Sequence, residues 1–183
     1  MEILDIVDEN GVPTGKTVER EKAHREGILH RTSHVWILRE KNHKVQILLQ
    51  KRSSRKDSYP DCYDISSAGH IPAGVDFVPS AIRELKEELG CSVNEDDLIY
   101  CGKRRFYFEE VFHGQLFVDH QVSHVYVLWL DQEEKDFILQ KEEVSEVRWF
   151  DLDDCFDKVK KNLIKHCIYL EELEIVKRGI EKR

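Results

Sequence analysis

The stretch that most constrains the fold is residues 69–91, in which a glycine-containing loop leads into an amphipathic helix. Gly90 follows the last apolar residue and is placed as a C-terminal stop. A helix with one apolar stripe must bury that stripe against another layer of structure. The residues that recur at helical spacing within the predicted helix, Val78 to Leu89, are Ile82, Leu85 and Leu89.

Three carboxylates share another face of this helix. Glu84, Glu87 and Glu88 are related by three and four residues, so they project to the same side. Like charges repel, but hard divalent cations such as Mg²⁺ favour clustered carboxylate oxygens. The pattern therefore predicts either a metal site or an exposed, solvated acidic face.

Apolar, β-branched runs around this helix predict a sheet. Two pairs of runs are separated by short turns and are typical of hairpins, and Gln121 to Leu130 is apolar on both faces, which indicates a central strand. The last apolar pattern, from about 158 to 180, predicts one long C-terminal helix packed on the sheet. Together these patterns predict an α/β protein, a mixed sheet between helical layers. The expected strands are Ile3–Val7, His34–Leu38, Val45–Leu49, Phe106–Val111, Gln115–Val118, Gln121–Leu130 and Val144–Phe150.

Composition narrows the class of protein. The chain has 183 residues and a formal net charge of −8, and no repeat or linker divides it, so residues 1–183 are predicted to form one domain. No apolar run approaches the ~18 residues of a membrane span, and the acidic N-terminus lacks the pattern of a secretory signal, which predicts a cytoplasmic location and no membrane partner. Five cysteines without a CxxC pair indicate reduced thiols. The acidity argues against a nucleic acid polymer as partner, and an anionic substrate would need clustered basic residues or a cation.

Residues 69–91 resemble the Nudix box, a long gapped pattern of glycines, glutamates and one arginine. One position departs from it: Val75 stands where the family has its first glutamate. Asp76 either substitutes for that glutamate or caps the helix. The positions in register are Gly69, Arg83, Glu84, Leu85, Glu87, Glu88, Gly90 and Cys91.

The resemblance implies a Nudix fold of α/β/α layers and hydrolysis of a diphosphate by attack of water on phosphorus. It implies that Glu84, Glu87 and Glu88 ligate Mg²⁺ or Mn²⁺, and that Arg83 orients the carboxylates. It also implies a possible homodimer, because family members often dimerise. The general base is left open between Glu87, acting through a metal-shared water, and three acids before the last strand that could equally be solvated turn residues. These are Glu142, Glu143 and Glu146.

Beyond the box, the order of motifs from about Leu4 to Asp151 resembles Nudix proteins related to isopentenyl diphosphate isomerase. The isomerases carry a catalytic cysteine where this chain has Ala68, and a proton-transferring glutamate where it has Gln121. Neither residue can exchange a proton at neutral pH. Isomerase activity is therefore disfavoured.

Two further features of that subgroup have partial matches. His24, His30 and His70 resemble metal-binding histidines, which predicts either a transition-metal site with Asp119 or a vestigial, hydrogen-bonded cluster. The residues that resemble the diphosphate-binding set are Arg20, Arg52, Lys56 and His70, although the basic residues near position 52 could also form a solvated loop. The predicted function is metal-dependent hydrolysis of a small organic or nucleoside diphosphate. The alternatives are an isomerase-like enzyme and a non-catalytic nucleotide-binding module.

Overall fold

The computed structural model describes residues 1–181, and its centre is the long strand β3 (His30–Lys41). One edge of β3 pairs in parallel with β8 (Gln115–Trp129), which in turn pairs antiparallel with β7 (Leu98–Phe112). The other edge is shared by β6 (Ser67–His70) and β4 (Lys44–Arg52), both antiparallel to β3. The sheet is therefore mixed, and β8 is a central strand as the sequence predicts.

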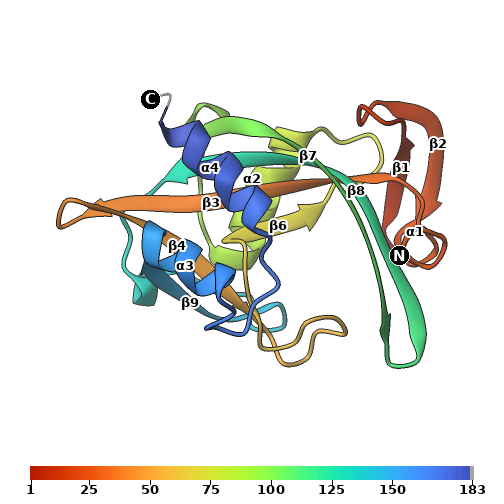
Figure 1. The fold of residues 1–183 in the computed structure, drawn as a ribbon. Coiled ribbons are helices and arrows are strands. Elements are labelled where there is room, and N and C mark those ends of the chain that lie inside the picture. Colours follow the sequence, from red (N-terminus) through yellow and green to blue (C-terminus); the bar gives the residue numbers. More distant parts are fainter. Residues whose placement is uncertain (182–183) are drawn as a thin grey trace.

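The remaining elements extend or cover this sheet (Figure 1). β4 also pairs with β5 (Tyr63–Asp64) and β9 (Val144–Asp151), while β1 (Ile3–Val7) and β2 (Pro13–Glu19) form a separate two-stranded sheet. The helices are α1 (Arg20–Glu26), α2 (Phe77–Leu89), α3 (Leu152–Lys160) and α4 (Leu170–Ile180), with short 3-10 turns at Glu95–Asp97 and Glu134–Asp136. None of the helices in residues 1–181 is long and apolar enough to cross a membrane.

The side chains of β3 alternate between two hydrophobic cores. Val35 and Ile37 pack with Leu85 and Leu89 of α2, whereas the next residue in the strand, Trp36, packs with residues of α3 and α4. In Figure 1, α3 and α4 lie in front of the sheet and α2 lies behind it. The predicted arrangement of a mixed sheet between helical layers is confirmed.

The prediction of one long helix over about 158–180 is wrong. α3 ends at Lys160, Asn162 takes a left-handed φ of 52°, and α4 begins only at Leu170. The segment between the helices runs beside β5, where Tyr63 accepts a backbone hydrogen bond from Cys167. Leu163 falls within the apolar pattern of residues 158–180 but is 65% exposed, so helical spacing of apolar residues does not correspond to burial in this segment.

Two other differences concern strand lengths and missed elements. The expected strands at 115–118 and 121–130 are one continuous strand, β8. β2 and α1 carry no strong apolar period and were not predicted: β2 buries only Val18, and α1 buries Ala23 and His24. These short elements are held by packing on β1 and β8 rather than by local pattern.

Candidate functional site

The helix α2 begins and ends at the residues that its chemistry favours. The side chain of Asp76 accepts a hydrogen bond from the backbone N–H of Phe77 at 2.8 Å, and Gly90 closes the helix with φ of 70°. The Asp76 side chain is 82% exposed. Of the two interpretations of Asp76, the helix N-cap is the one that the structure confirms.

Two of the three carboxylates of α2 face inward. Glu88 is buried and accepts a hydrogen bond from the Ser67 hydroxyl at 2.9 Å, with the Gln50 amide at 3.5 Å. The Glu84 side chain is only 16% exposed, while Glu87 lies on the exposed side of the helix. The three predicted metal ligands therefore differ in exposure: the Glu88 carboxylate is buried, and the Glu87 carboxylate faces solvent.

Gly69 makes room for this face. A Cβ at position 69 would lie 2.4 Å from Cδ of Glu84 and 2.6 Å from its Oε1, much closer than real Cβ contacts. The glycine is thus required by the close approach of β6 to α2. It is the absence of a side chain, rather than a special φ angle, that the site uses here.

Arg83 links α2 to the end of β6. Its Nη2 donates to Glu84 Oε1 at 2.5 Å and lies 3.4 Å from the carbonyl oxygen of His70. A guanidinium at this place holds the Glu84 carboxylate in a defined direction. Of the three carboxylates of α2, Glu84 is the one that Arg83 is shown to contact.

The electrostatics of the carboxylates fit a bound cation. Burial raises the pKa of Glu88 to about 8, and the negative charge of Glu84 adds to this rise. Burial also raises the pKa of Glu84. Hard oxygen donors gathered on one helix face, opposite a glycine that leaves space, are a donor set that suits Mg²⁺ or Mn²⁺.

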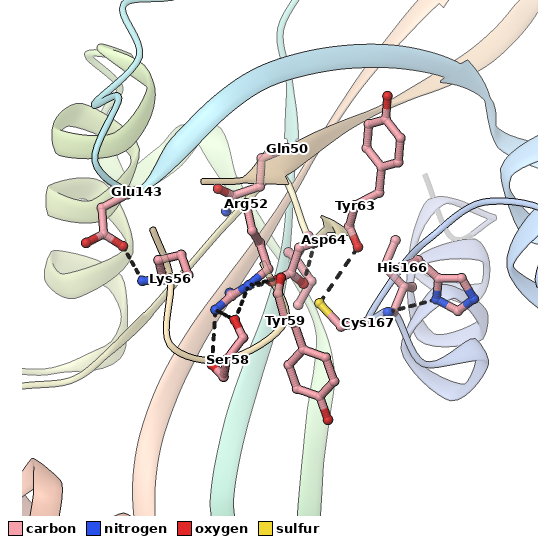
Figure 2. Close-up of polar contacts among 12 residues, drawn as sticks. Gln50, Arg52, Lys56, Ser58, Tyr59, Tyr63, Asp64, Glu143, His166 and Cys167 are labelled. Atoms are coloured by element: carbon pink, nitrogen blue, oxygen red, sulfur yellow. Dashed lines mark hydrogen bonds and ion pairs between the residues drawn. The ribbon is translucent and has the colours of Figure 1, made fainter. Parts of the chain in front are cut away.

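The segment before β9 lies against the C-terminal end of α2, because the backbone N–H of Gln140 donates to the carbonyl oxygen of Glu88 at 3.0 Å. From this segment, Glu143 forms an ion pair with Lys56 (Figure 2). Of the other acids considered as a base, Glu146 accepts from the Tyr63 hydroxyl and Glu142 is exposed. Glu143 is the one of the three whose ion-pair partner, Lys56, acts on the pKa of Glu88.

Arg52, one of the predicted substrate-binding residues, has several hydrogen-bond partners within the chain. Its Nη1 donates to Asp64 at 3.0 Å, and its other nitrogens donate to the carbonyl oxygens of Ser58 and Tyr59 (Figure 2). The guanidinium therefore clamps the loop between β4 and β5. The same loop carries Lys56, so Arg52 positions a second predicted binding residue.

Arg20 and His70 lie at the other end of the site. Arg20 is exposed and pairs with Glu2 at 3.0 Å, and its charge lowers the pKa of His70, which burial already holds well below its ordinary value. His24 Nε2 is 3.0 Å from His70 Nε2. Arg20 therefore acts on His70 through its charge, whereas Arg52 and Lys56 stand at the end of β4 and in the loop after it.

The three predicted histidines form one cluster, with ligand atoms within 4.8 Å of one another. His30 Nδ1 donates to the carbonyl oxygen of Ile28 at 2.8 Å, so Nε2 of the neutral ring carries a lone pair. This Nε2 atom has no hydrogen-bond partner among residues 1–181. Burial lowers the pKa of His24 to about 3 and that of His30 to about 4, so both rings are neutral near pH 7. Asp119 lies outside this group, and burial raises its pKa to about 6. Both interpretations of the cluster require this proximity.

Sequence reasoning missed the partners of Glu88. Ser67 stands two residues before Gly69, where the Nudix-like stretch begins, and this closeness in sequence is the one signal that points to it. Gln50 carries no such signal, because β4 and α2 meet only through the fold. Trp36 lies in the core formed with α3 and α4, and Trp129 packs against that core.

Comparison with known proteins gives a consistent picture. The sequence model of the NUDIX domain matches residues 28–168. The chain is 36% identical to an uncharacterized Nudix hydrolase of Clostridium acetobutylicum over 143 residues, which are 78% of this chain and 66% of that protein. It is 41% identical to Nudix hydrolase 3 of Arabidopsis thaliana over 152 residues, 81% of this chain but only 19% of that protein. The chain therefore spans less than two thirds of the length of these relatives.

A solved structure shows the same fold. The crystal structure of DR0079 from Deinococcus radiodurans superposes with a TM-score of 0.68 at 20% sequence identity, covering 94% of this chain and 98% of the other. At this identity the likeness concerns the fold alone.

Proposed function

Because this chain belongs to the Nudix family, we propose that it hydrolyses the diphosphate linkage of a small organic or nucleoside diphosphate with Mg²⁺ or Mn²⁺. The observation that carries the proposal is the packing of Glu84 and Glu88 on one face of α2, where Gly69 leaves room for the Glu84 side chain. Buried carboxylates at this spacing are costly unless a cation or a proton compensates their charge.

Each residue of the site has a defined role in this proposal. A bound divalent cation neutralises phosphate oxygens and lowers the pKa of a coordinated water. Glu84, Glu87 and Glu88 supply the oxygen ligands, and Arg83 holds Glu84 in direction. Glu143, held by Lys56, is the proposed general base, with Glu87 as the alternative within the helix.

The substrate would be held from two sides. Lys56 reaches the site from the loop after β4, and on the other side stand Arg20 and His70, the second of which belongs to the histidine cluster. Arg52 contributes by clamping the loop that carries Lys56, since its guanidinium already donates to Asp64, Ser58 and Tyr59. The substrate is a small molecule, and a cytoplasmic location stays a prediction.

The experiment is a screen of nucleoside, sugar and prenyl diphosphates with Mg²⁺ or Mn²⁺ and identification of the products. Glu88→Gln is expected to abolish metal-dependent release of phosphate or monophosphate while the far-UV circular dichroism is unchanged. Glu174→Gln makes the same chemical change on the exposed side of α4 and is expected to keep full activity. Full activity of Glu88→Gln would refute the assignment.

The same screen separates the alternatives. A non-catalytic module would bind a nucleoside diphosphate without turnover, and Glu87→Gln would leave that binding unchanged. An isomerase would release an allylic isomer and no phosphate. Ala68 and Gln121 argue against the isomerase, because neither side chain can transfer a proton. Ala68 lies in β6 opposite His34, and Gln121 lies in β8 opposite His30.

A further inference from the structure

The hairpin of β7 and β8 extends beyond the body of the fold, and β7 is the last strand of the sheet (Figure 1). The two strands are joined by a two-residue turn, His113-Gly114, in which both residues have positive φ, 52° and 79°. Phe112 and Gln115 flank this turn and are paired. The outer edge of β7 is therefore a strand edge that no neighbouring strand of residues 1–181 covers.

The turn determines which backbone groups face outward. Residues that flank a two-residue turn form a hydrogen-bonded pair, and hydrogen-bonded and non-hydrogen-bonded pairs alternate along an antiparallel ladder. Even-numbered residues near the turn thus bond to β8, and odd-numbered ones present N–H and C=O at the outer edge. For residues 105–111, no bond from these outward groups appears among the backbone hydrogen bonds outside strands in the described chain. A long unpaired edge is a template for another strand.

The side chains of this edge are exposed on one face. Tyr107 is 58% exposed and Val111 is 62% exposed, and Arg105 and Glu109 lie on the same face. The even-numbered side chains point to the other face. Phe106, for example, packs on the Tyr169 ring with centroids 4.6 Å apart.

The sequence of this edge is self-complementary. Residues 104–110 read Arg-Arg-Phe-Tyr-Phe-Glu-Glu, with two basic residues before the aromatic triplet and two acidic residues after it. We propose that β7 pairs antiparallel with β7 of a second copy of this chain, about a two-fold axis through Tyr107. Arg105 of each copy then lies opposite Glu109 of the other, and Phe106 lies opposite Phe108. Opposite charges across strands stabilise a ladder, and like charges oppose it.

Two features together select this register: the alternation of outward-facing and inward-facing backbone groups along β7, and the positions of the charged residues. An axis between two residues would pair outward-facing groups with inward-facing ones and form no ladder. An axis through Phe106 would place Arg105 opposite Tyr107, and one through Phe108 would place Glu109 opposite Tyr107. Only the axis through Tyr107 sets the arginine against the glutamate, twice per dimer.

The charges that this interface needs are available at the surface. Arg105 and Glu109 are both exposed. Arg105 forms an ion pair with Glu9 and contacts His120, and Glu109 accepts a hydrogen bond from the Tyr107 hydroxyl at 3.1 Å. Arg104 is different, because it is buried against Glu171 and Glu172. The charge complementarity therefore rests on Arg105 and Glu109. It does not depend on the proposed hydrolysis.

The test is a charge swap read out by sedimentation equilibrium. The unmodified chain is expected to be a dimer, and Arg105→Glu and Glu109→Arg are each expected to shift it to monomer, because each places like charges opposite one another. The double variant is expected to restore the dimer, since the swap recreates both pairs. Lys161→Glu changes an exposed ion pair far along the chain, at the end of α3, and is expected to remain dimeric.

A cross-link tests the register. A residue on the axis meets its own copy, and Cα atoms of a hydrogen-bonded pair are ~5.5 Å apart, within the range of a disulfide. Tyr107→Cys is therefore expected to form a covalent dimer on oxidation, whereas the unmodified chain under the same oxidant is not. A monomeric unmodified chain, a dimer that survives both single charge reversals, or a dimeric Tyr107→Cys variant that does not cross-link would each overturn the proposal. Circular dichroism checks that every variant is folded.

Discussion

Nδ1 of His34 lies 2.7 Å from Oε1 of Glu172, although 137 residues separate them in the chain. The same carboxylate accepts from Trp36 Nε1 at 3.0 Å and, through Oε2, from Arg104 Nη1 at 3.2 Å. All four side chains are buried. One glutamate of α4 thus joins β3 and β7, and it lies beyond the residues matched by the NUDIX sequence model.

Removal of the Glu172 carboxylate is expected to lower the free energy of unfolding strongly. Glu172→Ala leaves His34 buried without its counter-charge and leaves Arg104 with only the exposed Glu171 as a partner. Loss of one member of a buried ion pair costs about 3–5 kcal/mol. Urea unfolding followed by circular dichroism measures the change. The control is Glu174→Ala, an exposed residue of the same helix, for which a loss near zero is expected. Equal losses in the two variants would contradict the assignment.

The same pair predicts how stability depends on pH. Burial disfavours the charged His34 ring, but the charge and hydrogen bond of Glu172 outweigh this and raise the pKa of His34 above 6.5. Asp64 supports the rise and Arg104 opposes it. Because the folded pKa is above the unfolded one, this stabilisation is fully present below pH 6.5 and is lost as pH rises through the folded value.

The measurement is the free energy of unfolding across neutral and mildly alkaline pH, compared with His34→Gln. The unmodified protein is expected to lose stability with rising pH more steeply than the variant, which has no ionisable group at this position. Parallel curves would show that His34 does not titrate between the two states in this range.

Gly69→Ala is expected to displace Glu84, since the new Cβ would lie 2.4 Å from its Cδ. We expect strong loss of metal-dependent hydrolysis with a folded chain, because the clash is with a side chain and not with backbone. Gly102→Ala is a matched control, with a Cβ that meets only Ile175 Cγ2 at 3.1 Å, away from α2. An active Gly69→Ala enzyme would show that the close approach of β6 is not needed.

Substitutions of Arg52 and of Lys56 are expected to have different effects on stability and on substrate binding. Arg52→Lys loses the fork that joins Asp64 to the carbonyl oxygens of the loop, so its melting temperature should fall and the loop should become more sensitive to proteases. Lys56→Ala is expected to raise KM with little change in melting temperature. If Arg52→Lys instead raised KM with an unchanged melting temperature, direct substrate contact would replace the clamp.

Local pattern was sufficient for some elements and not for others. α2 was predicted almost to the residue, because its apolar period, N-cap and terminal glycine all lie within one short stretch. The segment at 161–169 has a helical apolar spacing but runs beside β5 without forming a helix, and tertiary hydrogen bonds such as that from Tyr63 N to Lys165 O hold it there. Spacing reports which residues prefer burial, not which neighbour buries them.

For the candidate site, the sequence by itself determined that Glu84, Glu87 and Glu88 share a helix face after a glycine-containing loop, since a period of 3.6 residues is a local property. Only the tertiary structure decided that Glu88 is buried against Ser67, that Arg52 clamps a loop rather than facing outward, and that β7 is left as an open edge. The physical reason is that burial, pKa and partner choice depend on segments far apart in the chain. These come together only when the sheet has formed.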